Sequence, residues 1–168
     1  MPSFTSQDFI AIVQFEEKSE DRSAGIVGAA IVDGQLASAI ASRFRPLSAR
    51  VYERLLGDHG SISDFAIKAD LGLALGLYGT ETHDDVRTII KIRNLFAHRK
   101  DVESFDDPEI SALCDPLRLP GHDPGKQFST VPPTTRKGRY LRTVQVICVG
   151  LLAEEATATA PNLYDGLP

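Results

Sequence analysis

TETHDDVRTIIKIRNLFAH, residues 80–98, is the stretch of sequence that decides the fold class. Its apolar residues recur at helical spacing, and Glu81, Asp84 and Asp85 lie in the first turns, where the helix dipole favours negative charge. Gly79 suits the end of a preceding helix, and Thr80 or Thr82 suits the N-cap. The pattern predicts an amphipathic α-helix that ends at His98.

Arg93 has an unusual place in this helix. At about 100° per residue it falls near the middle of an arc formed by Val86, Ile89, Ile90, Phe96 and Ala97. A guanidinium does not lose its proton inside a protein, so an inward Arg93 needs an anion. The sequence predicts an ion pair with Asp70, on the apolar sector of the preceding helix. A phosphate or a second subunit is the alternative.

Asn94 and His98 are four residues apart and share one face of the helix, whereas Arg93 and His98 diverge by about 140°. One subunit therefore does not aim Arg93 and His98 at a single target. Two antiparallel copies across a two-fold axis would bring Arg93 of one chain near His98 of the other, so we expect a homodimer. A simpler role for His98 is to satisfy unpaired carbonyls at the helix C-terminus.

The rest of the chain also has helical patterns. They predict a short helix from Ser6, for which a strand is the alternative, then helices at Ser19–Phe44, Leu47–Leu56, Ile62–Tyr78, Pro108 onward and about Arg136–Ala156. Gly25, Gly28 and Gly34 indicate places where neighbouring helices approach closely. The predicted helix over 62–78 is apolar on most sides, so we expect it at the centre of the core.

These elements predict one all-α domain over residues 1–168, a bundle of about six to seven helices with its core in residues 6–158. Segment 115–135 is rich in proline, and its length is typical of a mobile or functional loop. We expect the tail, residues 161–168, to be frayed.

Composition excludes several classes of function. The formal net charge is -5, which disfavours wholesale wrapping of nucleic acid. Cys114 and Cys148 lie in apolar surroundings, as buried free thiols do, and His59, His83 and His122 stand alone, so neither a metal nor another cofactor is expected. The start of the chain lacks a signal-peptide pattern, and its longest apolar run, residues 23–42, is interrupted by Asp33 and glycines. These features predict a cytoplasmic protein outside the membrane.

Four cations cluster at the start of the last predicted helix: Arg136, Lys137, Arg139 and Arg142. A helix N-terminus disfavours positive charge, so something else must account for them. Salt bridges or a solvated face are the common explanation, and contact with phosphates of RNA or with an anionic partner is the functional one.

Arg93-Asn94-x-x-x-His98 resembles the signature of HEPN domains, Arg, then Asn or another polar residue, then His after three to five residues; these domains are helical bundles that often act as metal-independent endoribonucleases. The resemblance implies that His98 moves a proton during attack of a ribose 2′-hydroxyl. It also implies that Arg93 stabilises the developing charge, while Asn94 orients the phosphate or His98.

A longer resemblance runs through YERLLGDHGSISDF (residues 52–65), Lys68–Leu71, Ala74–Leu77, the Arg93-to-His98 motif and FDDPEI (residues 105–110). In this order the segments are similar to the mannitol operon repressor (MtlR) family. That family is all-helical, lacks a helix-turn-helix and is associated with negative regulation of a sugar-alcohol operon. The main expectation is thus a regulatory protein that acts through a protein partner, and an endoribonuclease is the alternative.

Overall fold

The computed structural model describes residues 18–121 and 133–158, which contain α-helices and one 3-10 turn but no strand. The elements are α2 (Asp21–Ser42), α3 (Ala49–Leu56), α4 (Phe65–Ala74), α5 (Thr80–His98), α6 (Pro108–Cys114), η1 (Leu119–Gly121) and α7 (Arg136–Thr157). The all-α prediction is therefore confirmed for this part of the chain. The predicted helix from Ser6, most of the proline-rich segment, His122 and the tail lie outside the described residues.

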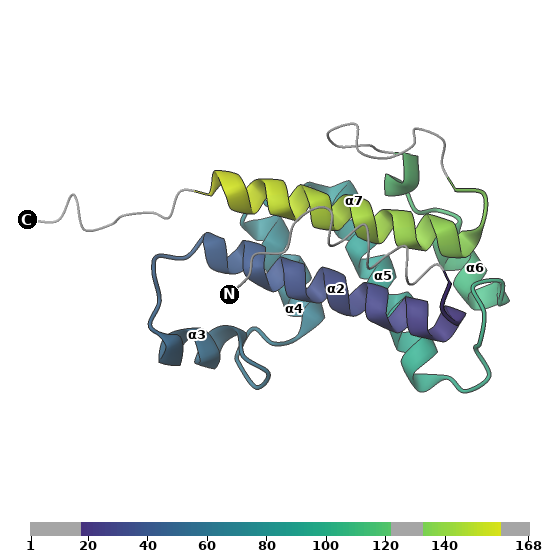
Figure 1. Ribbon diagram of the computed structural model, residues 1–168, viewed down its shortest axis with the longest axis horizontal. Helices are drawn as coiled ribbons and strands as arrows, with labels where there is room; N and C mark the ends of the chain where they lie inside the picture. The colour runs from purple at the N-terminus through teal and green to yellow at the C-terminus, as the bar shows by residue number, and fades with distance from the viewer. Residues whose placement is uncertain (1–17, 122–132, 159–168) are drawn as a thin grey trace, which may run out of the picture.

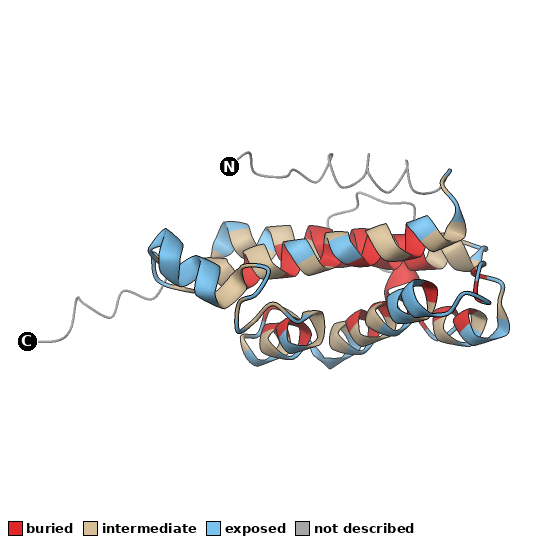
Figure 2. Cartoon of the chain, turned by 90° about the horizontal axis from the view of Figure 1, so that it is seen from below, coloured by how far each residue is buried: buried red, intermediate tan, exposed pale blue. Residues whose placement is uncertain are grey.

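The two long helices, α2 and α7, lie side by side and form one layer of the bundle, with α4, α5 and α6 in a second layer (Figures 1 and 2). Buried residues face the space between the layers in Figure 2. The largest fully buried side chains include Tyr140, Phe96 and Phe105, whose rings form a chain with successive centroids 5.1 Å apart. This aromatic chain joins α5, the segment before α6, and α7.

Two glycines of α2 allow close packing, as predicted. A methyl group at Gly25 would overlap the Phe96 ring, and one at Gly28 would lie 2.9 Å from Tyr140 Cε1. The Tyr140 hydroxyl also donates a hydrogen bond to the carbonyl oxygen of Gly25 at 2.6 Å. At Gly34 no heavy atom of the described residues lies within 4 Å of such a methyl group, so in this part of the chain the predicted close approach at that position is wrong.

The predicted helix over residues 62–78 is shorter than expected. Asp64 takes the N-cap position and accepts from the backbone N–H groups of Ala66 and Ile67 at 2.8 and 3.0 Å. At the other end the chain turns at Gly76, whose φ of 68° is easy only for glycine. The buried residues of α4 are Lys68, Ala69 and Gly72, so the prediction that this helix forms the centre of the core is wrong. The α2–α7 pair has that role.

α3 differs from the other helices in having no buried residue. Ser48 caps it, and it ends before Gly57.

Among the helices that the structure describes, α2 is long and apolar enough to cross a membrane by length and composition, with a mean hydropathy of 1.5. Half of that window is buried inside the bundle.

Candidate functional site

A cavity of about 380 Å³ lies between α2, the N-terminus of α4 and the middle of α5. Eleven residues line it: Ile26, Ala29, Ala30, Asp33, Ser63, Asp64, Phe65, Ala66, Ile90, Arg93 and Asn94. Three separate segments of the chain thus meet here, and two of them, residues 63–65 and 93–94, belong to the stretches that resemble the MtlR family. We take this Arg93 cavity as the candidate functional site.

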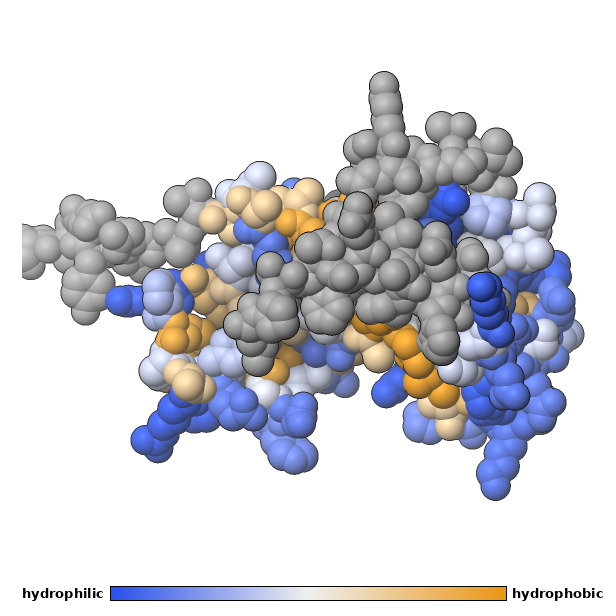
Figure 3. Space-filling view, viewed as in Figure 1, coloured by the Kyte–Doolittle hydropathy of each residue, from blue (hydrophilic) through white to orange (hydrophobic). Residues whose placement is uncertain are grey.

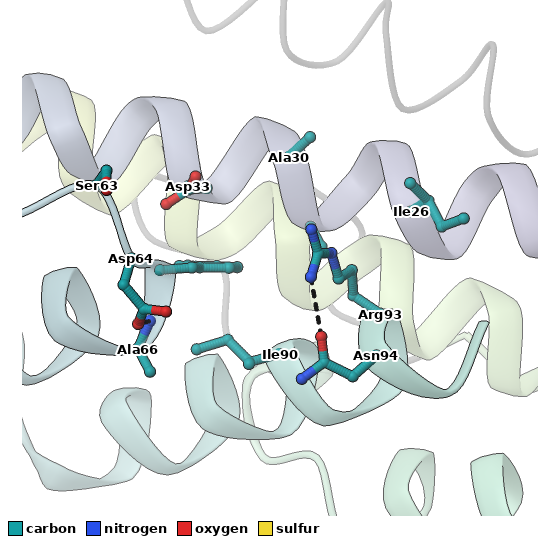
Figure 4. A pocket seen from close by; sticks show the side chains of 11 residues that line it. Ile26, Ala30, Asp33, Ser63, Asp64, Ala66, Ile90, Arg93 and Asn94 are labelled. Carbon is teal, nitrogen blue, oxygen red and sulfur yellow. Dashed lines mark hydrogen bonds between the residues drawn. The ribbon is translucent and has the colours of Figure 1, made fainter. Parts of the chain in front are cut away.

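Arg93 extends from α5 toward α2, and its Nη1 donates a hydrogen bond to Asn94 Oδ1 at 2.9 Å (Figure 4). Ile26 and Ala30 of α2 lie on the far side of the guanidinium, and Ile90 lies one turn earlier on α5. The α2 side of the cavity therefore presents Ile26, Ala29 and Ala30 together with Asp33, and the α5 side presents the guanidinium and the Asn94 amide.

The predicted burial of Arg93 and its ion pair with Asp70 are wrong. Arg93 is exposed, because the buried face of α5 is centred on Ile89, Ile92 and Phe96 and leaves Arg93 at its edge. The carboxylate of Asp70 is 66% exposed and pairs with His83 Nε2 at 2.8 Å. Arg87 Nη1 lies 3.9 Å from the same oxygen.

His98 is the last residue of α5 and is exposed, and it does not line the Arg93 cavity. The structure therefore brings Arg93 and Asn94 together and leaves His98 apart from them. No hydrogen bond or ion pair joins the His98 side chain to the residues described in the structure, so its suggested role as a helix cap is wrong.

The C-terminus of α5 is instead capped by Arg22, at the start of α2. Its guanidinium donates to the carbonyl oxygens of Phe96, Arg99, Lys100 and Val102, the last at 2.6 Å. The Phe96 carbonyl belongs to the last turn of α5 and the other three follow the helix, and a cation here also complements the negative end of the helix dipole. Sequence analysis missed Arg22, because the cap lies 74 residues away from the end that it satisfies.

Asp85 is a buried carboxylate that the sequence did not single out beyond its place near the helix start. It is 3% exposed and accepts from the backbone N–H groups of Arg118 and Leu119, each at 3.0 Å. Burial raises the pKa of this carboxyl, against the lowering effect of those two N–H donors. Asp85 therefore fixes the segment around η1 onto α5.

The predicted basic patch is used largely within the protein. Arg136 pairs with Asp106 and Asp115 at 3.0 and 3.1 Å, and Lys137 donates to the Ser19 carbonyl oxygen at 2.6 Å. Arg139 donates to the carbonyl oxygens of Cys114, Asp115 and Leu117 and so caps α6. Arg142 is half-buried and also has an interaction partner. The salt-bridge explanation accounts for this cluster better than a phosphate-binding face does.

Both cysteines are buried free thiols, as predicted. Burial raises the pKa of Cys114 to about 12 and raises that of Cys148 as well, so neither forms a reactive thiolate at neutral pH. Within residues 18–121 and 133–158, no group of three or more His, Cys, Asp or Glu side chains is placed to hold a metal ion.

Comparison with known proteins rests on structure. No protein-family model matches the sequence, and no curated protein matches it significantly. The fold is similar to that in the crystal structure of the MtlR–HPr complex from Escherichia coli, with a TM-score of 0.60 and 18% sequence identity. The alignment covers 90% of this chain and 96% of that chain. The chain therefore has an MtlR-like all-α fold.

Proposed function

We propose that this protein is a non-enzymatic regulator of transcription that acts by binding a protein partner in the cytoplasm. The observation that carries the proposal is the MtlR-like fold over 90% of the chain, since that MtlR structure was solved as a complex with HPr. The sequence segments that resemble the MtlR family support the same assignment.

The surface around α3 offers a suitable contact for a protein. Val51 and Tyr52 of α3 are large hydrophobic side chains that remain exposed, at 39% and 41%. Apolar and strongly hydrophilic side chains lie next to each other over this end of the molecule (Figure 3). Arg50, Glu53 and Arg54 are the charged residues of α3 and all are exposed, so the surface suits a partner with an apolar centre and a polar rim of mixed charge.

Titration calorimetry with purified HPr tests the proposal. We expect a one-to-one complex, and Tyr52→Ser should raise the Kd about tenfold or more if the ring is a central anchor of the contact. Lys91→Ser, an exposed substitution on α5, is the matched control and should leave the Kd unchanged. Absence of any heat of binding to HPr, in protein shown to be folded by circular dichroism, would contradict this choice of partner.

A metal-independent endoribonuclease is the second candidate, because Arg93, Asn94 and His98 are all exposed and accessible to a substrate. Arg93 and His98 point in different directions within one chain, so this function requires a homodimer with an intersubunit site. The proposal of a regulator does not require such a site.

An RNA cleavage assay in the presence of a chelator separates the two candidates. If the protein is a regulator, single-stranded RNA stays intact. Cleavage by a contaminating nuclease would persist unchanged in His98→Ala. Cleavage that is lost in both His98→Ala and Arg93→Ala, and kept in Lys91→Ala, would establish the nuclease instead.

A further inference from the structure

The Arg93 cavity has the charge and shape of a site for a small molecule. Its volume of about 380 Å³ lies within the range that small-molecule sites occupy. Six of the eleven lining residues are apolar, and the other five are Asp33, Ser63, Asp64, Arg93 and Asn94. The small side chains of Ala29 and Ala30 on α2, and of Ala66 on α4, leave this space open.

The two carboxylates that border the cavity already have partners. Asp33 pairs with Lys68 Nζ at 2.6 Å, and the Lys68 side chain is 7% exposed, so this pair is partly shielded from water. Asp64 accepts two backbone N–H groups as the N-cap of α4. Both negative charges are therefore satisfied by groups of the protein itself.

Arg93 is different, because its partner is the neutral amide oxygen of Asn94. No carboxylate lies within ion-pair distance of its guanidinium among the residues that the structure describes. Asn94 turns its oxygen to Arg93, and its NH₂ group points away from the guanidinium (Figure 4). A positive charge with free N–H donors thus borders a partly apolar space.

We infer that the Arg93 cavity binds a small organic carboxylate with an apolar body. A planar guanidinium matches a carboxylate through two parallel hydrogen bonds, and the apolar lining residues receive the carbon skeleton. A phosphate fits less well, because its second negative charge would find no further cation among the residues that line the cavity. This inference is independent of the proposed binding of HPr, which concerns α3.

Amide chemical-shift mapping by NMR tests the inference with hexanoate and benzoate as probes and with 1-hexanol and benzyl alcohol as their neutral counterparts. We expect shifts confined to residues around 26–33, 63–66 and 90–94, with a Kd of about 1 mM for ligands of this size. The neutral alcohols should bind at least about tenfold more weakly, because they lack the charge-assisted hydrogen bonds.

Three variants complete the test. Arg93→Gln should weaken binding of both carboxylates about tenfold, and Ala30→Leu, at an exposed helical position, should block the cavity while keeping α2 folded. Arg87→Gln, on the same helix but outside the cavity, should bind as the unchanged protein does. Equal binding of carboxylates and alcohols, unchanged binding by Arg93→Gln, shifts elsewhere in the protein, or tighter binding of inorganic phosphate would each overturn the assignment.

Discussion

Gly25 and Gly34 lie on the same helix, α2, but their surroundings differ. Gly25 packs against the ring of Phe96, which is itself held edge-on to Phe105, whereas Gly34 faces open space. Helix propensity alone would favour alanine at both positions. The difference in stability between the two alanine variants therefore measures the free-energy cost of crowding the aromatic rings next to Gly25.

Gly25→Ala should lower the free energy of unfolding by about 1–2 kcal/mol, since the strain of overpacking exceeds the roughly 1 kcal/mol that alanine gains in a helix. Gly34→Ala should raise it by up to about 1 kcal/mol. Urea unfolding followed by circular dichroism measures both. Equal effects of the two substitutions would show that the Phe96 ring moves aside freely.

The sequence predicts the role of an individual side chain well where that role is local, and poorly where it depends on contact with a distant segment. Pro108 is the first residue of α6, as the local pattern predicts, whereas the Asp107 carboxylate accepts from the N–H groups of Glu103 and Ser104 and does not cap the helix. Asp70 was assigned to Arg93 from the helical wheel, but the turn at Gly76 changes how α4 meets α5 and brings His83 to the carboxylate. A helical wheel gives directions around one axis, whereas ion pairs depend on how two axes cross.

Among the helices, α5 depends most on a distant side chain. Arg22 of α2 satisfies carbonyls both in and beyond its last turn, and this same turn carries His98. The cap therefore fixes where α5 stops and where the chain leaves it.

Arg22→Met should lower the free energy of unfolding by about 1–3 kcal/mol, because it keeps the long apolar stem and leaves several carbonyls without a donor. Hydrogen exchange at the end of α5 should rise more than exchange at its centre. Arg99→Met is the control, since its ion pairs with Asp101 and Glu109 are exposed and contribute little. A similar loss in both variants would argue against the capping role of Arg22.

The positions of the helices could be predicted from the sequence, whereas the extent to which each helix is buried could not. α5 was predicted with its observed end because amphipathic spacing and acidic first-turn residues agree. α4 was predicted too long and too central, since a nearly all-apolar sequence gives no signal of which side faces the core. The Arg93 cavity was not predicted at all, because its walls come from three helices and its size depends on small residues of α2.

For the molecule as a whole, the buried carboxylate of Asp85 makes stability depend on pH. Its pKa is raised in the folded protein by burial, whereas in the unfolded chain an Asp has a pKa of about 3.9. Between these two values the native state binds more protons than the unfolded state. The free energy of unfolding therefore falls as pH rises through that window.

Asp85→Asn should remove this contribution while keeping an oxygen that accepts from the segment around η1. From about pH 4 upward, the free energy of unfolding of the unchanged protein should fall relative to that of the variant. Once the native carboxyl is ionised, the difference between the two free energies should stay constant. Urea unfolding of both proteins over a series of pH values measures it. Parallel curves across the whole series would mean that Asp85 does not titrate with a raised pKa.

The pairing of α2 with α7 has a consequence for how the protein is made. Gly25 and Tyr140 are joined by a hydrogen bond across 115 residues of sequence, and Phe96 and Phe105 pack on the same ring system. During synthesis α2 leaves the ribosome long before its main partner exists, and its apolar surface stays uncovered in the meantime. The core is completed after translation of α7, so a ribosome that stalls before residue 140 leaves a chain prone to aggregation.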